Sequence, residues 1–152
     1  MILSSACNYG ILATLYIAKE QRTNEGYMSI RRLSNELNIS FHFLTKILQT
    51  LTAEGLLHSH KGPKGGVMLA KPAKEISILD IVYAIDGSDI FTECVLGLPG
   101  CGDEKPCPMH EQWARVREEL KGMFGSKTLD RTAEEIEEMK LRLSDLSRAE
   151  HK

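Results

Sequence analysis

Residues 29–53 read SIRRLSNELNISFHFLTKILQTLTA and contain two short helical patterns joined by a single turn. Ser29 is a good N-cap for the first helix, because its hydroxyl can accept a hydrogen bond from the first turn. Asn38 tolerates the left-handed backbone of a tight turn, and Ser40 can cap a second helix over residues 41–53. The apolar positions of the first helix follow the helical spacing i, i+3, i+7 and are Ile30, Leu33 and Leu37.

The second helix has two distinct faces. Its apolar stripe consists of Leu44, Ile47, Leu48 and Leu51, and its polar stripe consists of His42, Thr45, Lys46 and Gln49. Two short helices, the second with a polar and basic exposed face, are typical of a helix-turn-helix. In that interpretation the second helix enters the major groove of DNA with its Ser40 end toward the bases. The alternative is an ordinary helical hairpin with a solvated face.

The segment after this pair predicts a β-hairpin. Residues 56–60 and 67–70 read as two strands, and the tip KGPKGG at residues 61–66 joins them. The tip carries Lys61 and Lys64, which can reach phosphates or the minor groove. A phosphate-binding loop is the alternative, but this tip precedes a strand and lacks P-loop spacing. A lysine-bearing hairpin directly after a helix-turn-helix is typical of a wing.

A second decisive stretch, Cys94–His110, reads CVLGLPGCGDEKPCPMH and holds three of the four cysteines. Three glycines and three prolines predict a wrapped loop, because these residues favour turns and interrupt regular structure. The spacing Cys94-x6-Cys101-x5-Cys107-x2-His110 predicts a metal or cluster site. Thiolates at such wide spacing can surround an iron–sulfur cluster.

A single zinc ion is the main alternative for this loop. Structural zinc sites usually open with a Cys-x(2–4)-Cys pair, which the loop lacks. A loop with free thiols, or with one disulfide and a spare thiol, is a further alternative, but disulfides are uncommon in reducing compartments and an odd number of local cysteines pairs badly. The residues alone therefore leave cluster and zinc open. The isolated Cys7, in the pattern of a buried helix over residues 4–20, reads as a small core residue.

The C-terminal half predicts three more helices. Ser77 and Asp80 form a capping box that starts a helix over residues 78–85. A long helix follows Pro108, and its apolar seam consists of Trp113, Val116, Leu120 and Phe124. Such a seam packs against a second copy of the chain or against its own domain. Thr132 and Glu135 predict a capping box for a final helix to about residue 146, with Ile136, Met139, Leu143 and Leu146 as its apolar positions.

Charge is distributed unevenly over the 152 residues. Residues 1–75 carry nine Lys or Arg and five Asp or Glu, whereas residues 76–152 carry ten and sixteen. A basic first half predicts an anion-binding module, with nucleic acid as the leading partner. No apolar run approaches ~20 residues, so we expect no membrane span and a cytoplasmic protein. No Cys-x-x-Cys pair or nucleophile triad is visible, so we expect no enzyme.

We therefore expect a mainly α protein with a small β-hairpin wing. Residues 1–75 would form a winged helix-turn-helix DNA-binding domain. Residues 76–152 would hold the cluster-binding loop, a long dimerisation helix and a helical tail. The alternative is a zinc-stabilised structural or protein-interaction module, in which the same loop holds one zinc ion.

The chain resembles the Rrf2 family, the IscR/NsrR-like winged-helix transcription regulators. The resemblance covers roughly residues 1–130 and rests on four segments: the wing KGPKGGV at 61–67, IVYAIDG at 81–87, the three-cysteine loop, and the Trp113 helix ending near Thr128. It implies a homodimer that binds a palindromic operator. Repression is the expected mode, and the residues leave activation open as the alternative. It also implies an iron–sulfur cluster at the loop that senses redox state, iron or nitric oxide.

The resemblance carries over residue by residue to the cluster ligands. Cys94, Cys101 and Cys107 match the thiolates of the family, and His110 stands where the IscR branch places the histidine ligand of its 2Fe–2S cluster. The NsrR branch completes a 4Fe–4S cluster with a carboxylate from the partner chain. Asn8 occupies that place here, and an amide is a poor ligand. The resemblance thus favours His110 and 2Fe–2S over 4Fe–4S, although the Cys94–Cys101 gap is one residue longer than in IscR.

The base-reading positions of the family fall on His42, Thr45 and Lys46. IscR has a glutamate where Thr45 stands, so the operator preference should differ. The family wing usually carries arginine where Lys61 stands, and lysine offers a point charge in place of a two-pronged donor.

Overall fold

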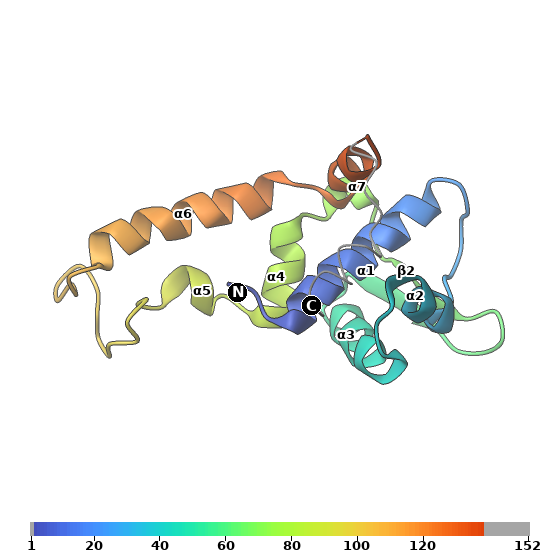
Figure 1. Ribbon diagram of the computed structural model, residues 1–152, viewed down its shortest axis with the longest axis horizontal. Coiled ribbons are helices and arrows are strands. Elements are labelled where there is room, and N and C mark those ends of the chain that lie inside the picture. Colours follow the sequence, from blue (N-terminus) through green and yellow to red (C-terminus); the bar gives the residue numbers. More distant parts are fainter. Residues whose placement is uncertain (1, 139–152) are drawn as a thin grey trace.

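The computed structural model describes residues 2–138 (Figure 1). Its elements in chain order are α1 (Ser5–Gln21), α2 (Ile30–Leu37), α3 (Phe41–Ala53), β1 (Leu57–His60), β2 (Gly66–Leu69), the short 3-10 helix η1 (Ala73–Glu75), α4 (Ile78–Asp86), α5 (Asp89–Thr92), α6 (His110–Ser126) and α7 (Leu129–Glu138). The predicted class, mainly α with one β-hairpin, is confirmed. No helix in the described part combines the length and apolar character that a membrane span needs.

Helix α1 runs through the centre of the body and contacts α2, α3, α4, α7 and β2. The Ser4 hydroxyl caps it by accepting a 3.0 Å hydrogen bond from the Cys7 N–H. Other elements pack on several sides of α1, which explains why apolar residues cover most of its circumference. Cys7 is fully buried, as predicted. The helix is therefore the core element on which the others are arranged.

The helix-turn-helix forms where the sequence predicts it. The Ser29 and Ser40 hydroxyls cap α2 and α3 by accepting hydrogen bonds from the third residue of each helix. Asn38 adopts the left-handed conformation, with φ of 55°. The buried stripes of the two helices face α1 and each other, and each fully buried leucine contributes about 1.5–3 kcal/mol. These leucines are Leu33, Leu37, Leu44, Leu48 and Leu51.

The predicted wing is an antiparallel hairpin in which Leu57 pairs with Leu69 and His60 pairs with Gly66. Met28, in the connection before α2, adds an isolated bridge to Val67 on the other edge of β2. Val67 and Leu69 are buried, whereas His60 and residues 61–64 of the tip are exposed. The wing tip therefore stands free of the body while its base is fixed to it (Figure 1).

Residues from the predicted DNA-binding part (1–75) and residues that follow it in the chain pack into one buried cluster. Helix α4 begins with the predicted capping box, in which Ser77 and Asp80 bond each other's backbone N–H at 2.9 and 3.1 Å. Its buried residues Ile81 and Val82 pack into the same cluster as α1 and α3. An isolated bridge between Ser77 and Thr128 ties the start of α4 to the start of α7.

The start of the last helix corrects a prediction. The sequence placed a capping box at Thr132 and Glu135, but α7 begins four residues earlier than this box predicts, at Leu129. The Thr128 hydroxyl accepts a 3.2 Å hydrogen bond from the Arg131 N–H and so caps the first turn. The bridge to Ser77 fixes this earlier start. Of the apolar positions predicted for this helix, Met139, Leu143 and Leu146 lie outside the described residues.

Helix α6 extends away from the body, and the cysteine loop lies at its far end, opposite the wing (Figure 1). Three residues of the predicted seam face their own chain. Leu120 and Phe124 pack against the core cluster, and Trp113 bonds the segment after α5. Val116 is 44% exposed and therefore lies at the solvent-facing edge of the seam. The short helix α5, which the sequence did not predict, packs beneath α6 and buries Phe91 against Phe124.

Candidate functional site

The three loop cysteines converge although the first and the last are 13 positions apart along the chain. Their sulfur atoms all lie within 4.8 Å of one another. Cys94 follows α5, Cys107 precedes α6, and Cys101 lies midway along the loop. The Cys94 and Cys107 sulfurs are 3.7 Å apart, and the Cys107 N–H points at the Cys101 sulfur at 3.4 Å. The loop therefore forms a compact set of soft donors, which suits zinc or iron–sulfur chemistry.

Two successive turns bring Cys101 back to Cys94. The Gly97 N–H donates to the Cys94 carbonyl at 2.9 Å, and the Cys101 N–H donates to the Leu98 carbonyl at 3.3 Å. Gly97 and Gly100 have φ of 69° and 73°, a conformation that side chains disfavour. The two glycines thus explain how a six-residue spacer closes on itself.

His110, the first residue of α6, borders this sulfur group. Its Nδ1 atom lies 3.6 Å from the Cys101 sulfur, and its Nε2 atom lies 3.0 Å from Oδ1 of Asp103. A carboxylate at one ring nitrogen orients the ring and favours the proton there, so the other nitrogen can donate its lone pair to a metal. The four predicted ligands therefore form two close pairs, Cys94 with Cys107 and Cys101 with His110.

A cavity of about 380 Å³ adjoins the ligands. It is lined by Thr92, Cys94, Cys101, Gly102, Asp103, His110, Ala114 and Arg117. Cys107, the remaining predicted ligand, does not line this cavity. The donor set of three thiols and an imidazole fits an iron–sulfur cluster and also fits a single zinc ion.

The loop environment separates the acidities of its thiols. The Leu98 amide N–H, aimed at the sulfur, is the main reason that the pKa of Cys94 is lowered to about 7. The Cys107 N–H favours ionisation of Cys101, but partial desolvation and the thiols of Cys107 and Cys94 outweigh it and raise the pKa of Cys101. By contrast, burial raises the pKa of the core thiol Cys7 to about 12.

Asn8 is the amide at the alternative ligand position. It lies on α1 and is absent from the described lining of the cavity. Its Nδ2 atom is buried without a hydrogen-bond partner.

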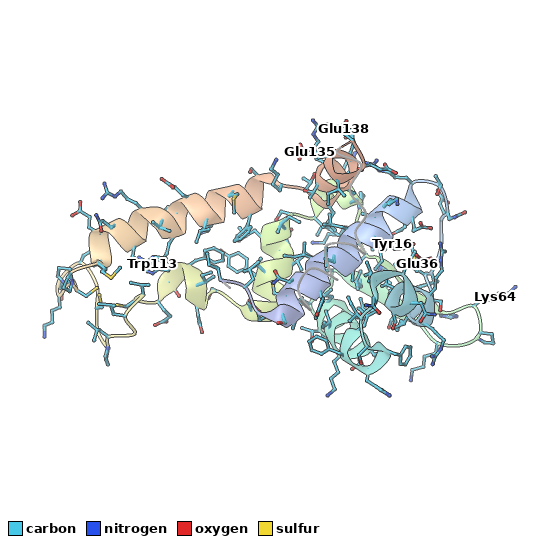
Figure 2. All side chains as sticks on the ribbon, viewed as in Figure 1. Tyr16, Glu36, Lys64, Trp113, Glu135 and Glu138 are labelled. Carbon is cyan, nitrogen blue, oxygen red and sulfur yellow. The ribbon has the colours of Figure 1, made fainter. Side chains whose placement is uncertain are left out.

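The predicted DNA-contacting residues gather on α3 and the wing. Ser40, His42, Lys46, Gln49, Lys61 and Lys64 are exposed, and Thr45 is half-buried. The Ser40 hydroxyl is used as the N-cap, and the Thr45 hydroxyl donates to the Phe41 carbonyl at 2.7 Å. A groove of about 400 Å³ separates α3 from the wing, with Thr45, Gln49 and Lys61 in its walls. Lys64 stands at the outermost point of the wing (Figure 2).

Four residues near these sites were not identified from the sequence. Arg31 on α2 places its guanidinium 4.6 Å from the centre of the Phe41 ring at the start of α3. Tyr27 stacks on His60 at the base of the wing, with ring centres 5.3 Å apart. Asp103 and Arg117 border the cysteine cavity. The adjacent basic pair at positions 31 and 32 was a usable signal, whereas the loop contacts depend on tertiary structure.

Comparisons with known proteins agree with this architecture. Residues 3–135 match the Rrf2 family, described as an iron-dependent transcriptional regulator. The HTH-type transcriptional regulator IscR of Photorhabdus laumondii is 31% identical over 130 residues, which cover 86% of this chain and 77% of that protein. The structure of CymR, the global cysteine regulator of B. subtilis, aligns with a TM-score of 0.70 at 27% identity over 87% of this chain and 95% of that one.

IscR of T. potens has the same fold, with a TM-score of 0.72 at 23% identity over 91% of this chain and 90% of that structure. The relatives are named as regulators, which is a non-enzymatic role. The helix-turn-helix and the wing both lie within residues 3–135, the range that matches the family. The chain therefore belongs to the Rrf2 family of winged-helix, DNA-binding transcription regulators.

Proposed function

We propose that this protein is a homodimeric transcription regulator whose operator binding is controlled by an iron–sulfur cluster. Residues 1–75 would bind DNA, and residues 76–152 would hold the cluster and the dimer contact. The observation that carries the proposal is the convergence of three thiols within 4.8 Å directly before α6. Because a regulator works where the DNA is, we assign it to the cytoplasm.

We propose Cys94, Cys101, Cys107 and His110 as the ligands, with 2Fe–2S as the cluster type. Each iron of such a cluster takes two protein ligands, and the four side chains form two pairs at 3.7 and 3.6 Å. Asn8 offers no carboxylate for a 4Fe–4S site. When bound, the cluster supplies a one-electron redox centre that oxygen and nitric oxide can reach at an exposed loop.

On the DNA side, α3 would enter the major groove and the wing would follow the backbone. His42, Lys46 and Gln49 are exposed along α3, so they can meet base edges. The half-buried Thr45 presents its methyl group, since its hydroxyl is bonded within the helix. Lys61 and Lys64 would contact phosphates, and two such heads about 34 Å apart would read a palindrome.

The dimer would use the free face of α6. Met109, the residue before α6, and Val116 and Met123 within it recur every seven residues and are 43–50% exposed. A heptad-spaced apolar line on a charged helix is a packing surface for a second helix. The predicted seam residues Trp113, Leu120 and Phe124 would then hold α6 against its own chain, while Val116 contacts the partner.

Control of DNA binding would be a population shift. The cysteine loop joins α5 to α6, and α6 leads through Thr128 to α7 and the body. A change at the loop can therefore alter how two bodies sit in a dimer. Cluster and DNA must each bind the two arrangements unequally for this to happen.

The proposal is tested by purification without oxygen, followed by visible absorbance and by iron and acid-labile sulfide analysis. We expect two irons and two sulfides per chain. His110→Ala should lower the iron and sulfide content or shift the absorbance, whereas Asn8→Ala should leave both unchanged. A sulfide-free protein would contradict the proposal.

A zinc-stabilised module is a second candidate, favoured by one observation. Two thiolates on a tetrahedral zinc ion lie about 3.8 Å apart, given zinc–sulfur bonds of about 2.3 Å. The Cys94–Cys107 distance of 3.7 Å fits this arrangement as well. A colourless protein with one zinc per chain and no sulfide would support this candidate.

A further inference from the structure

Two side chains of α6, Trp113 and Arg117, bind the backbone at the end of α5. The indole Nε1–H of Trp113 donates to the Glu93 carbonyl at 2.9 Å. The Arg117 guanidinium donates from Nη1 to the Thr92 carbonyl at 2.8 Å and to the Glu93 carbonyl at 3.3 Å. The two residues are one turn apart on α6 and therefore share a face, which looks toward α5. Figure 2 shows Trp113 on that side of the helix.

These carbonyls occupy a special place in the chain. They lie at the C-terminal end of α5, where helix carbonyls lack partners within the helix. The Glu93 carbonyl also belongs to the peptide unit that contains the nitrogen of Cys94. Because a peptide unit is planar, holding its oxygen fixes the direction in which the chain enters Cys94. The two α6 side chains thereby fix the position of Cys94 relative to α6.

Arg117 has a second relation to the site. It lines the same cavity as Cys94, Cys101 and His110 and is half-buried. Among residues 2–138, no carboxylate pairs with its guanidinium within 4.0 Å. The charge of Arg117, which has no described carboxylate within that distance, therefore borders a cavity lined by two thiols, by His110 and by the Asp103 carboxylate. Exposed charges would be screened by water, but a half-buried one acts more strongly on its neighbours.

We propose that Trp113 and Arg117 are positioning residues of the cysteine site and that the charge of Arg117 favours the reduced form of its cluster. The inference rests on the proposed iron–sulfur function. Three thiolates and a neutral imidazole make the site anionic, and one-electron reduction adds a further negative charge. The cation stabilises that added charge, while the two donors keep Cys94 in place against α6.

Three variants separate these effects in the full-length protein purified without oxygen. Trp113→Phe removes the N–H and keeps the ring, Arg117→Lys keeps the charge and removes the two-carbonyl contact, and Arg117→Gln removes both. Arg115→Gln is the matched control, since it removes the same charge from an exposed position on the same helix. Reduction potentials are measured by dithionite titration with mediator dyes, and cluster loss by the absorbance decay in excess chelator.

We expect Trp113→Phe and Arg117→Lys to lose the cluster about tenfold faster at an unchanged potential. Arg117→Gln should in addition shift the reduced-to-oxidised ratio about tenfold toward the oxidised form, which is about 59 mV for one electron. Wild-type loss rates in Trp113→Phe and Arg117→Lys would overturn the positioning role. A wild-type potential in Arg117→Gln would overturn the electrostatic role. A wild-type protein without iron and sulfide would instead contradict the proposed function itself.

Discussion

Met28 and Val67 exchange two backbone hydrogen bonds: the Met28 N–H donates to the Val67 carbonyl at 2.8 Å, and the Val67 N–H donates to the Met28 carbonyl at 2.9 Å. The bridge joins the connection before α2 to the inner strand of the wing. It therefore couples the position of the wing to that of the helix-turn-helix. Gly66, next to Val67, makes this approach possible, because a Cβ atom there would lie 1.9 Å from the Met28 carbonyl oxygen.

Gly66→Ala should destabilise the fold and displace the wing. The substitution adds the clash with Met28 to the strain of a side chain at φ of 143°, which together cost about 3 kcal/mol. Chemical denaturation measures the loss of stability, and DNA titration measures the loss of affinity. Gly122→Ala is the control, because its Cβ would meet open space within a helix. A Gly66→Ala protein as stable as the wild type would show that the bridge does not fix the wing.

The wing lysines should contribute affinity without sequence preference. Lys61→Ala and Lys64→Ala each remove one phosphate contact, so the slope of log affinity against log salt should fall by about 0.9 per substitution. The measurement is a salt titration of DNA binding with two unrelated duplexes. Lys105→Ala, an exposed lysine in the cysteine loop at the other end of the molecule, should leave the slope unchanged. An unchanged slope in both wing variants would exclude the wing from the DNA contact.

Cys7 should be the only thiol of the cluster-free protein that native conditions protect. Its side chain is fully buried, and burial raises its pKa to about 12. Alkylation at pH 8 with mass-spectrometric mapping should label Cys94, Cys101 and Cys107, and should label Cys7 only after unfolding. The pKa is raised only in the folded state, because the thiol of the unfolded chain ionises at about pH 8.5. The free energy of unfolding should therefore be unaffected by Cys7 below pH about 8.5 and should fall as the pH rises further. Rapid native labelling of Cys7 would contradict its place in the core.

The exposed and the packed apolar residues of α6 should respond differently to substitution. Val116→Asp puts a charge on the exposed heptad line and should produce a folded monomer. Leu120→Ala removes a side chain packed on the core cluster and should cost about 2 kcal/mol of stability while the dimer persists. Sedimentation measures the assembly, and thermal unfolding measures the stability. A Val116→Asp protein that remains dimeric would place the partner contact elsewhere.

The sequence is informative wherever structure is decided locally. Ser29, Asn38 and Ser40 act on their own turns, so the helix-turn-helix could be predicted to within a residue. The start of α7 was placed too late: the Thr128 hydroxyl caps this helix, and Thr128 also forms a bridge to Ser77, about fifty positions away along the chain. A local capping pattern at Thr132 was therefore misleading.

The candidate site also combines features that the sequence shows locally with features that depend on tertiary structure. The ligand types and their spacing are visible in the sequence, and the structure brings the three cysteines together. The pairing of His110 with Asp103 and the contacts of Trp113 and Arg117 depend on how the loop folds back over α5 and α6. The apolar seam was similarly ambiguous, since helical spacing does not say which neighbour an apolar face meets.

The most direct test compares DNA affinity in the two states of the cysteine site. Duplexes are selected from a random library without oxygen, once with the cluster-loaded protein and once with the cluster-free protein. Fluorescence anisotropy then gives Kd for both forms on every selected duplex. We expect at least one duplex on which the two values differ about tenfold or more, a coupling of about 1.4 kcal/mol. Equal affinities of both forms on all duplexes would contradict control of DNA binding by the cluster.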